Sequence, residues 1–347
     1  HDFFVGEANK KKYLNIFFNQ SYESNSLTGL NRYYSSGFHL LSAPIEYLLN
    51  FLLKLNYVSL ETKPILIKHP SVFLFFTISS IFFRKIIYLT TNDKNYSSLS
   101  TILYLSYPYL IGHSFFNIKD IPFLSVWLIC TYLIIYISNY YYKEKKIKFE
   151  YLLILSVLTS YLISIRISGI LIFIEYAVFL LFTLNISKSN YVSFLKLFYK
   201  KILLFLSLTL ILFYLLNPSY WNNPLDIIKG IKAMSFHIQT VCTITFGDCM
   251  KAQNLPSSYL PIWFFFKLPL LILFGLVYFI FKEKKFFSIL NNKLIIAPIL
   301  ITTLIIIFLL ILFNVNLYDE LRQVMFIIPL IFIISLTALF QIPKKIR

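Results

Sequence analysis

Long apolar segments recur along the chain, separated by short polar stretches. They lie near residues 69–83, 97–112, 121–141, 151–164, 169–186, 202–216, 260–281, 294–313 and 325–342. As helices, runs of roughly 16 to 22 apolar residues cross the hydrocarbon core of a bilayer, which is about 30 Å thick. The pattern therefore predicts an all-α, polytopic transmembrane protein with about nine visible spans and helical external loops.

Basic residues fall beside every second connection between these segments. The basic clusters occupy residues 84–85, 143–148, 196–201, 282–285 and 344–347. If every span crosses once, all five clusters lie on one side, and the positive-inside rule assigns that side to the cytoplasm. We expect the opposite connections to face the periplasm of a bacterium, with the protein in the inner membrane.

The composition indicates a lipid environment, and in that environment the net positive charge has another explanation than nucleic-acid binding. Hydrophobic residues make up 58% of the chain and charged residues 14%, and the mean hydropathy is +0.72. A water-soluble chain has no means of hiding so much apolar surface. The net charge of +17 follows from the basic clusters at span ends and does not indicate a nucleic-acid partner.

The chain divides into residues 1–68 and residues 69–347. The first part holds no clear span, but residues 38–55 are apolar on most faces and favour an interfacial helix in an external loop, with a short true span as the alternative. The second part is the transmembrane helical domain and includes a long external loop at 217–259. Because the chain opens at His1 with no apolar run, we expect a first span to precede it.

Three cysteines are present. Cys130 lies within a predicted span and is expected to be inert packing. Cys242 and Cys249 share the external loop, where an oxidising compartment favours a disulfide between them. A metal site at this pair is the weaker alternative, because no second Cys or His pair stands at ligand spacing.

Acidic residues gather on the side opposite the lysines. Except for Asp93, the aspartates fall in external segments, namely Asp2, Asp120, Asp226, Asp248 and Asp319. Acidic residues contribute little to membrane orientation, so topology alone does not explain this distribution. It suggests a functional site on the external side.

The segment 112–122 concentrates polar side chains in one turn between two predicted spans. It contains His113, Asn117, Lys119 and Asp120, followed by Pro122. One interpretation is a solvated turn in which Asn and Asp cap the next helix. The other is a cavity in which Asp120 orients a substrate or metal and Lys119 meets a phosphate.

Further charged residues stand near the external ends of predicted spans. Arg166 either snorkels to the headgroups or binds phosphate. Glu175 lies within a span, where an ionisable group is expected to be functional or paired. Tyr318 and Arg322 belong to the compact segment YDELR, in which Arg322 either holds a phosphate bidentately or forms an ordinary interfacial ion pair.

Several of these segments together resemble a known family. Tyr107 and Pro108 lead into GHSFFNIKDIP, and IRISG, NPSYW, LPSSYLP, LYDELR and FIIP follow in order on the external side. In this the chain is similar to the GT-C superfamily of polytopic glycosyltransferases, in particular the bacterial proteins related to protein O-mannosyltransferases and aminoarabinose transferases (glycosyltransferase family 39-like).

The resemblance implies an inverting transfer of a sugar from a polyprenyl-phosphate donor to a lipid, glycan or protein acceptor on the periplasmic or lumenal side, with a divalent cation not strictly required. It places the general base in the first external loop, where Asp2 stands and Glu7 is the alternative. Lys119, Arg166 and Arg322, with His113, Asn117 and Tyr318, are the expected substrate-binding residues. Asp120 is counted with the catalytic residues and is expected to organise the lysine or the sugar.

A transporter or lipid flippase is the principal alternative function. Such a protein would also have many spans and a few intramembrane charges, but it predicts inverted repeats and helices broken by Gly or Pro near mid-membrane. The chain has only eight glycines, and we detect no internal repeat.

Overall fold

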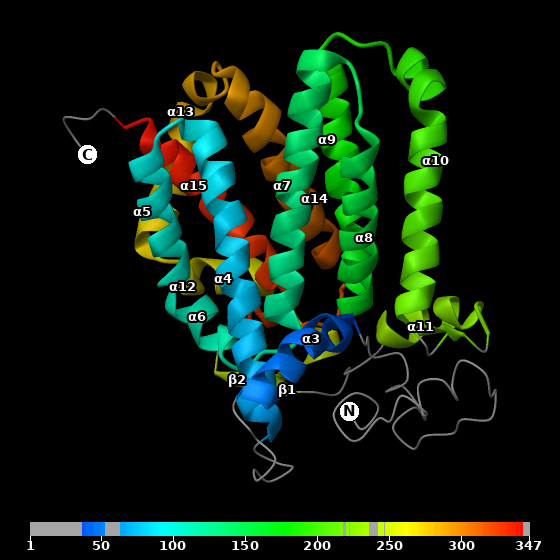
Figure 1. Ribbon diagram of the computed structural model, residues 1–347. Coiled ribbons are helices and arrows are strands. Elements are labelled where there is room, and N and C mark those ends of the chain that lie inside the picture. Colours follow the sequence, from blue (N-terminus) through cyan, green and yellow to red (C-terminus); the bar gives the residue numbers. More distant parts are fainter. Residues whose placement is uncertain are drawn as a thin grey trace.

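The chain forms a bundle of roughly antiparallel helices in the computed structural model (Figure 1), which describes residues 37–52, 63–217, 220–221, 223–235, 242–245 and 247–342. The elements are α3 (Gly37–Leu52), α4 (Lys63–Thr91), α5 (Lys94–Leu105), α6 (Pro108–Ser114), α7 (Asp120–Glu144), α8 (Phe149–Ile165), η4 (Ile167–Leu171), α9 (Ile172–Ile186), α10 (Tyr191–Leu216), α11 (Asp226–Ser235), β1 (Cys242–Thr245), β2 (Asp248–Lys251), η6 (Ala252–Asn254), α12 (Tyr259–Lys267), α13 (Leu270–Phe286), η7 (Asn292–Ile296), α14 (Ala297–Leu312), η8 (Arg322–Ile327) and α15 (Ile328–Phe340).

Six helices among the described residues are long and apolar enough to cross a membrane, or seven if the bent pair α12 and α13 is one span. The predicted class of all-α membrane protein is thus supported, but the predicted number of about nine spans is not confirmed. The segment predicted at 151–164 forms α8, an apolar helix of 17 residues that is shorter than the others. The predicted span at 97–112 is divided into α5 and α6.

Proline accounts for both breaks in the predicted spans. Tyr107 precedes Pro108 and adopts an extended backbone (ψ 115°), and Leu268 precedes Pro269 with ψ 141°. A residue before proline is driven out of the helical region by the proline ring, so each helix stops there. After the second break the chain turns by 116° between α12 and α13.

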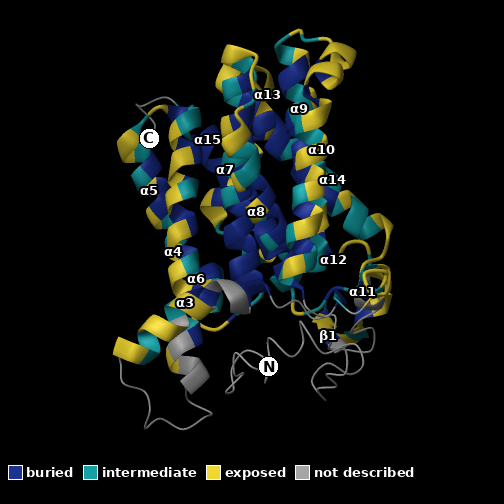
Figure 2. Ribbon diagram, turned by 45° about the vertical axis from the view of Figure 1, so that its right-hand side comes forward, coloured by how far each residue is buried: buried dark blue, intermediate teal, exposed yellow. Residues whose placement is uncertain are grey.

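The helices α7 and α15 form the centre of the bundle. In their most apolar windows 78% and 89% of the residues are buried inside the protein, against 17% for α10, which exposes its outer face (Figure 2). Lipid tails are as apolar as leucine, so packing between spans rests on van der Waals contact and close approach. At Gly275 in α13 a Cβ would fall 2.9 Å from the Ser335 backbone carbonyl oxygen of α15, which cannot rotate away as a side chain can, so glycine suits this contact.

The two ends of the bundle differ in charge. The connections α7–α8, α9–α10 and α13–α14, with their lysines, lie at the upper end in Figure 1, and we call this the lysine end. The opposite end holds α6, α11 and the hairpin β1–β2, and α3 lies across it (Figure 1). The two sets of loops are therefore separated as the charge pattern predicts, while the assignment of each end to a cell compartment stays a prediction.

The helix α3 covers most of the segment expected at the interface. It exposes large apolar side chains near its end, among them Tyr47 and Phe51, which are 77% and 72% exposed. Its other end packs closely, because a Cβ at Gly37 would lie within 2.8 Å of Ser164 on α8. This arrangement suits a helix lying along the membrane surface, although its position in a bilayer stays a prediction.

Candidate functional site

Asp120 opens α7 and is oriented by the turn before it. The Asn117 side-chain oxygen accepts the backbone N–H groups of Lys119 (3.2 Å) and Asp120 (2.9 Å), and the Asn117 side-chain nitrogen donates to Asp120 Oδ2 (2.9 Å). Asn117 therefore satisfies two backbone donors at the start of the helix and fixes the carboxylate at once. The capping interpretation of this turn therefore describes real contacts, while the role of Asp120 and Lys119 toward a ligand stays a prediction.

Two arginines from distant parts of the chain meet this carboxylate. Arg166, at the end of α8, donates from Nη1 to Asp120 Oδ1, and Arg322, at the start of η8, donates from Nε to Asp120 Oδ2 at 3.0 Å. The Asp120 side chain is 6% exposed, whereas Arg166 and Arg322 are 24% and 36% exposed. Because a buried carboxylate is costly without cations, the two guanidinium groups offset its burial while keeping an outward face.

Each arginine keeps N–H donors that make no hydrogen bond to the described residues. Arg166 donates only from Nη1 within the described residues, and the second bond of Arg322 runs from Nη1 to Asp319 Oδ2 at 2.9 Å. The Nη2 groups of both arginines therefore remain for a ligand. Adjacent guanidinium groups with free N–H donors are the arrangement that binds phosphate oxygens.

The turn that precedes Arg322 holds two acids in left-handed backbone conformations. Asp319 has φ 54° and Glu320 has φ 60°, a rare geometry for two successive residues that are not glycine. Their side chains diverge: Asp319 pairs with Arg322, and Glu320 Oε2 lies 2.6 Å from Lys267 Nζ. The strained turn thus places one acid against each cation.

Two aromatic side chains, Trp263 and Tyr109, lie beside Lys267. Lys267 Nζ lies 5.3 Å from the Trp263 ring centre and 5.6 Å from that of Tyr109, distances at which a cation is attracted to a ring. The Tyr109 ring in turn meets the His113 ring at 4.9 Å. His113 connects these rings to the residues around Asp120, because the His113 Nδ1 lies 3.4 Å from the Asn117 side-chain nitrogen.

Counting both groups of charged residues, the site carries a net positive charge. Arg166, Arg322, Lys119 and Lys267 are four cations, and Asp120, Asp319 and Glu320 are three anions, which leaves one excess positive charge when all are ionised. A phosphodiester carries one negative charge. The charge balance of the site is thus suited to such a ligand.

Burial changes the protonation of two residues here. Burial lowers the pKa of Lys119 from its usual 10.5 to about 8, and the Arg166 guanidinium acts in the same direction. Burial, followed by the Arg322 charge, also lowers the pKa of His113 below 6.5. At neutral pH, therefore, Lys119 is mostly a cation that titrates near pH 8, and His113 is neutral.

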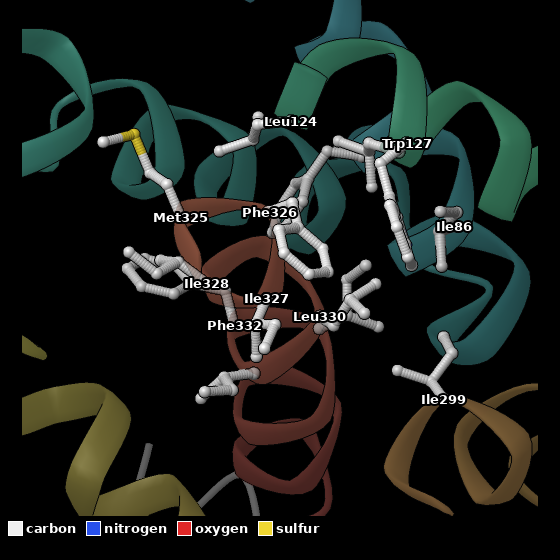
Figure 3. Close-up of a cluster of buried hydrophobic side chains, with 14 of the residues drawn as sticks. Ile86, Leu124, Trp127, Ile299, Met325, Phe326, Ile327, Ile328, Leu330 and Phe332 are labelled. Carbon is white, nitrogen blue, oxygen red and sulfur yellow. The ribbon is translucent and has the colours of Figure 1, made fainter. Parts of the chain in front are cut away.

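Aromatic rings pack inside the bundle close to the arginines. The centre of the Trp127 ring lies 4.3 Å from that of Phe326, with the two rings tilted by 38° (Figure 3), and Phe326 lies one turn after Arg322. The Arg166 guanidinium lies 5.9 Å from the centre of the Phe123 ring. The Trp127 indole nitrogen donates to Glu175 Oε2 at 2.8 Å, and both residues are fully buried. The intramembrane acid Glu175 therefore has a partner, and that partner packs beneath the site.

The structure brings together most of the residues predicted from sequence. His113, Asn117, Asp120, Arg166 and Arg322 are linked by direct contacts, and Lys119 joins them through its backbone and charge. Tyr318 lies in the same loop as Arg322. The proposed bases Asp2 and Glu7 lie outside the described residues.

The sequence interpretation missed Lys267 and Glu320. Lys267 is the one charged residue in the apolar run 260–281, and a single charge in such a run indicates a functional or paired residue. Glu320 stood in the noted segment YDELR but was not assigned a role. Their pairing needed the break at Pro269, which turns Lys267 toward the loop before Arg322.

The long loop between α10 and α12 contains a two-stranded hairpin. The strands β1 and β2 pair antiparallel, and Gly247 in the turn has φ 89°, a conformation that glycine adopts without strain. Cys249 is disulfide-bonded and Cys130 is free and buried, which leaves Cys242 as the remaining cysteine of the chain. The side chain of Cys242 itself lies outside the described set.

Across the described segments, no group of three or more His, Cys, Asp or Glu side chains is placed to hold a metal ion. No family model, curated protein or solved structure matches the chain.

Proposed function

We propose that this protein transfers a sugar from a polyprenyl-phosphate donor to an acceptor at the end of the bundle opposite the lysines. The observation that carries the proposal is the sharing of Asp120 by Arg166 and Arg322, which brings two guanidinium groups together, each with an Nη2 group that bonds to no described residue. The resemblance to membrane glycosyltransferases supplies the class of donor.

The chemistry requires cations where charge develops. The acceptor oxygen attacks the anomeric carbon on the face opposite the phosphate, and the bond between that carbon and the phosphate oxygen breaks with inversion. The departing oxygen keeps the electron pair, so the phosphate changes from one negative charge toward two. Arg166 and Arg322 stabilise this increase, and Lys119 adds a third positive charge below about pH 8.

Asp120 serves in this proposal as the residue that positions the arginines. Both of its carboxylate oxygens already accept hydrogen bonds, from Arg166 on one side and from Arg322 and Asn117 on the other. A carboxylate with both oxygens occupied is poorly placed to take the proton of an acceptor hydroxyl. That role stays with an acid of the amino-terminal segment, Asp2 or Glu7, as the sequence interpretation has it.

The direct test is consumption of a labelled donor. Purified protein is incubated with polyprenyl-phosphate sugars radiolabelled in the sugar, both with candidate acceptors and with water alone. We expect release of polyprenyl phosphate and loss of label from the lipid fraction for one class of sugar. A protein that binds these donors and never cleaves any of them would refute the proposal.

One observation favours a transporter or flippase as the second candidate. The pair α12 and α13 is bent by 116°, and broken helices are typical of transporters. In reconstituted vesicles a flippase would move intact donor between leaflets without cleaving it. The same labelled lipid therefore separates the two candidates, because transport conserves the lipid-linked sugar.

A further inference from the structure

A second feature lies far from the arginines, at the lysine end. An open hollow of about 450 Å³ is formed where α8 begins beside the first turns of α10, and we call it the α8–α10 hollow. Its lining consists of Ile147, Lys148, Phe149, Glu150, Tyr151 and Lys201. The lining comes from the start of α8 and the two residues before it and, through Lys201, from α10, which runs beside α8 in Figure 1.

Two cations from different elements converge on the α8–α10 hollow. Lys201 reaches from α10 to donate from Nζ to the Ile147 carbonyl oxygen at 2.6 Å, which holds its ammonium group in place. Lys148 Nζ lies 5.1 Å from the Tyr140 ring centre and 5.8 Å from that of Tyr151. Within the described residues each ammonium keeps N–H donors for a ligand, and with Glu150 the hollow has a net charge of +1.

An apolar stripe descends from the hollow along α8. Ile154 and Val157 follow Glu150 at helical spacing and are each 46% exposed. On the neighbouring α10, Leu204, about one turn after Lys201, is 44% exposed, in a helix whose apolar window is only 17% buried. In a membrane this surface is covered by hydrocarbon chains.

We propose that the α8–α10 hollow binds an anionic phospholipid. Its phosphate lies between Lys148 and Lys201, and its acyl chains follow the stripe at Ile154 and Val157. Juxtamembrane lysines attract anionic headgroups, and the aromatic rings beside Lys148 suit the level of the headgroups. The stripe favours a lipid over a free phosphate ion, because only a lipid gains contact with both surfaces. This inference is independent of the proposed sugar transfer.

The test measures lipid affinity by native mass spectrometry of the full chain in detergent, with phosphatidylglycerol, phosphatidylcholine and inorganic phosphate as probes. We expect tight binding of one phosphatidylglycerol, weak binding of phosphatidylcholine and no measurable binding of phosphate. The double variant Lys148→Gln/Lys201→Gln should weaken phosphatidylglycerol binding roughly 30-fold. Glu150→Gln should strengthen it severalfold, because it removes the one acid of the hollow.

The matched control is Lys282→Gln/Lys284→Gln, which removes the same charge from exposed positions at the same end. It should retain wild-type affinity. Equal losses of phosphatidylglycerol affinity in both double variants would show that any lysine at this end attracts the lipid by its charge alone, and would overturn the proposal. Binding of inorganic phosphate as tightly as the lipid would overturn it as well, because the stripe would then contribute nothing.

Discussion

Arg322 and Asp120 are 202 residues apart in the chain, and their side chains are paired at 3.0 Å. The same arginine holds Asp319 through a second nitrogen at 2.9 Å. One guanidinium group thus joins the start of α7 to the loop before α15, the two most buried spans of the bundle. The geometry depends on the planar fork of arginine, which presents several donors at fixed angles.

Replacing Arg322 with lysine should therefore impair the proposed transfer although the charge is retained. A single ammonium group cannot reproduce the two bonds and the free Nη2 at once. We expect kcat/KM for the labelled donor to fall about 100-fold, the scale seen when one stabilising donor is removed from a reacting anion. Steady-state kinetics with purified variants measures the effect.

The control for this substitution is Arg84→Lys. Arg84 lies in α4 and its Nε donates to Ser98 Oγ at 3.1 Å, away from the carboxylates of the site. Its substitution should leave kcat/KM unchanged. Equal activity of Arg322→Lys and Arg84→Lys would show that Arg322 plays no part in the transfer.

Donor binding should weaken as the pH rises through about 8. Lys119, whose pKa is about 8, is cationic below this pH and neutral above it, so its attraction for phosphate is lost on the alkaline side. Losing one charge-assisted contact corresponds to about tenfold in affinity. A phosphodiester donor is the suitable ligand, because its own charge does not change in this range.

The variant Lys119→Arg should bind the donor with little dependence on pH, since arginine remains charged throughout. Lys119→Gln should also be insensitive to pH but should bind weakly. Titrations of all three proteins across about pH 7 to about pH 9 test the assignment. A persistent decline near pH 8 in both variants would attribute the titration to another group.

The contact between Trp127 and Glu175 should contribute to stability. Trp127→Phe leaves the fully buried Glu175 oxygen without its donor, and we expect the free energy of unfolding to fall by about 1–3 kcal/mol for that reason. In a Glu175→Leu background the same change should cost less, because no acceptor remains. Unfolding of the four proteins in detergent gives the coupling, and additive losses would show that the hydrogen bond is unimportant.

The two ends of the bundle should be accessible from opposite sides of the membrane. Gly112 is exposed, and a Cβ added there meets nothing within 4 Å, so Gly112→Cys is a safe reporter for the end that holds Asp120. Lys284→Cys reports the lysine end. In intact cells an impermeant maleimide should label the first and not the second, and the reverse pattern would contradict the assigned orientation.

The positions of individual helices could be predicted, because each depends on a short segment of the sequence. Apolar length located the helices α7, α14 and α15, because lipid demands such runs wherever they occur. The same reasoning extended the predicted spans 97–112 and 260–281 through Pro108 and Pro269, where the helices stop. At these two places the local geometry of proline outweighed hydrophobicity.

The helix α5 illustrates why the predicted number of about nine spans is not confirmed. It has 12 residues, about 18 Å of helix, which is too short for a bilayer of about 30 Å. Tyr96 within it donates to the Leu336 carbonyl oxygen of α15 at 2.6 Å, so part of its polar surface is satisfied by the protein. Such contacts depend on tertiary packing and leave no trace in a hydropathy pattern.

The site was predictable as a set of residues but not as a set of bonds. External position and residue type indicated Asp120, Arg166 and Arg322, because a charged residue at the end of a span either helps to set the membrane orientation or takes part in function. Nothing in the sequence stated that both arginines would share one carboxylate, or that Glu320 would pair with Lys267. Asp120 is 46 residues from Arg166 and 202 residues from Arg322, and Lys267 is 53 residues from Glu320. Only the packing of the helices brings these segments together.

Cleavage of a radiolabelled polyprenyl-phosphate sugar, compared between the wild-type protein and Asp120→Asn, is the most direct measurement of the proposed role of the arginine pair. Asparagine keeps the shape of the side chain and removes the charge that holds Arg166 and Arg322 together. The wild-type protein should release polyprenyl phosphate, and the variant should remain folded and release it about 100-fold more slowly. No release by the wild-type protein, or equal release by both, would contradict a phosphate-binding arginine pair organised by Asp120.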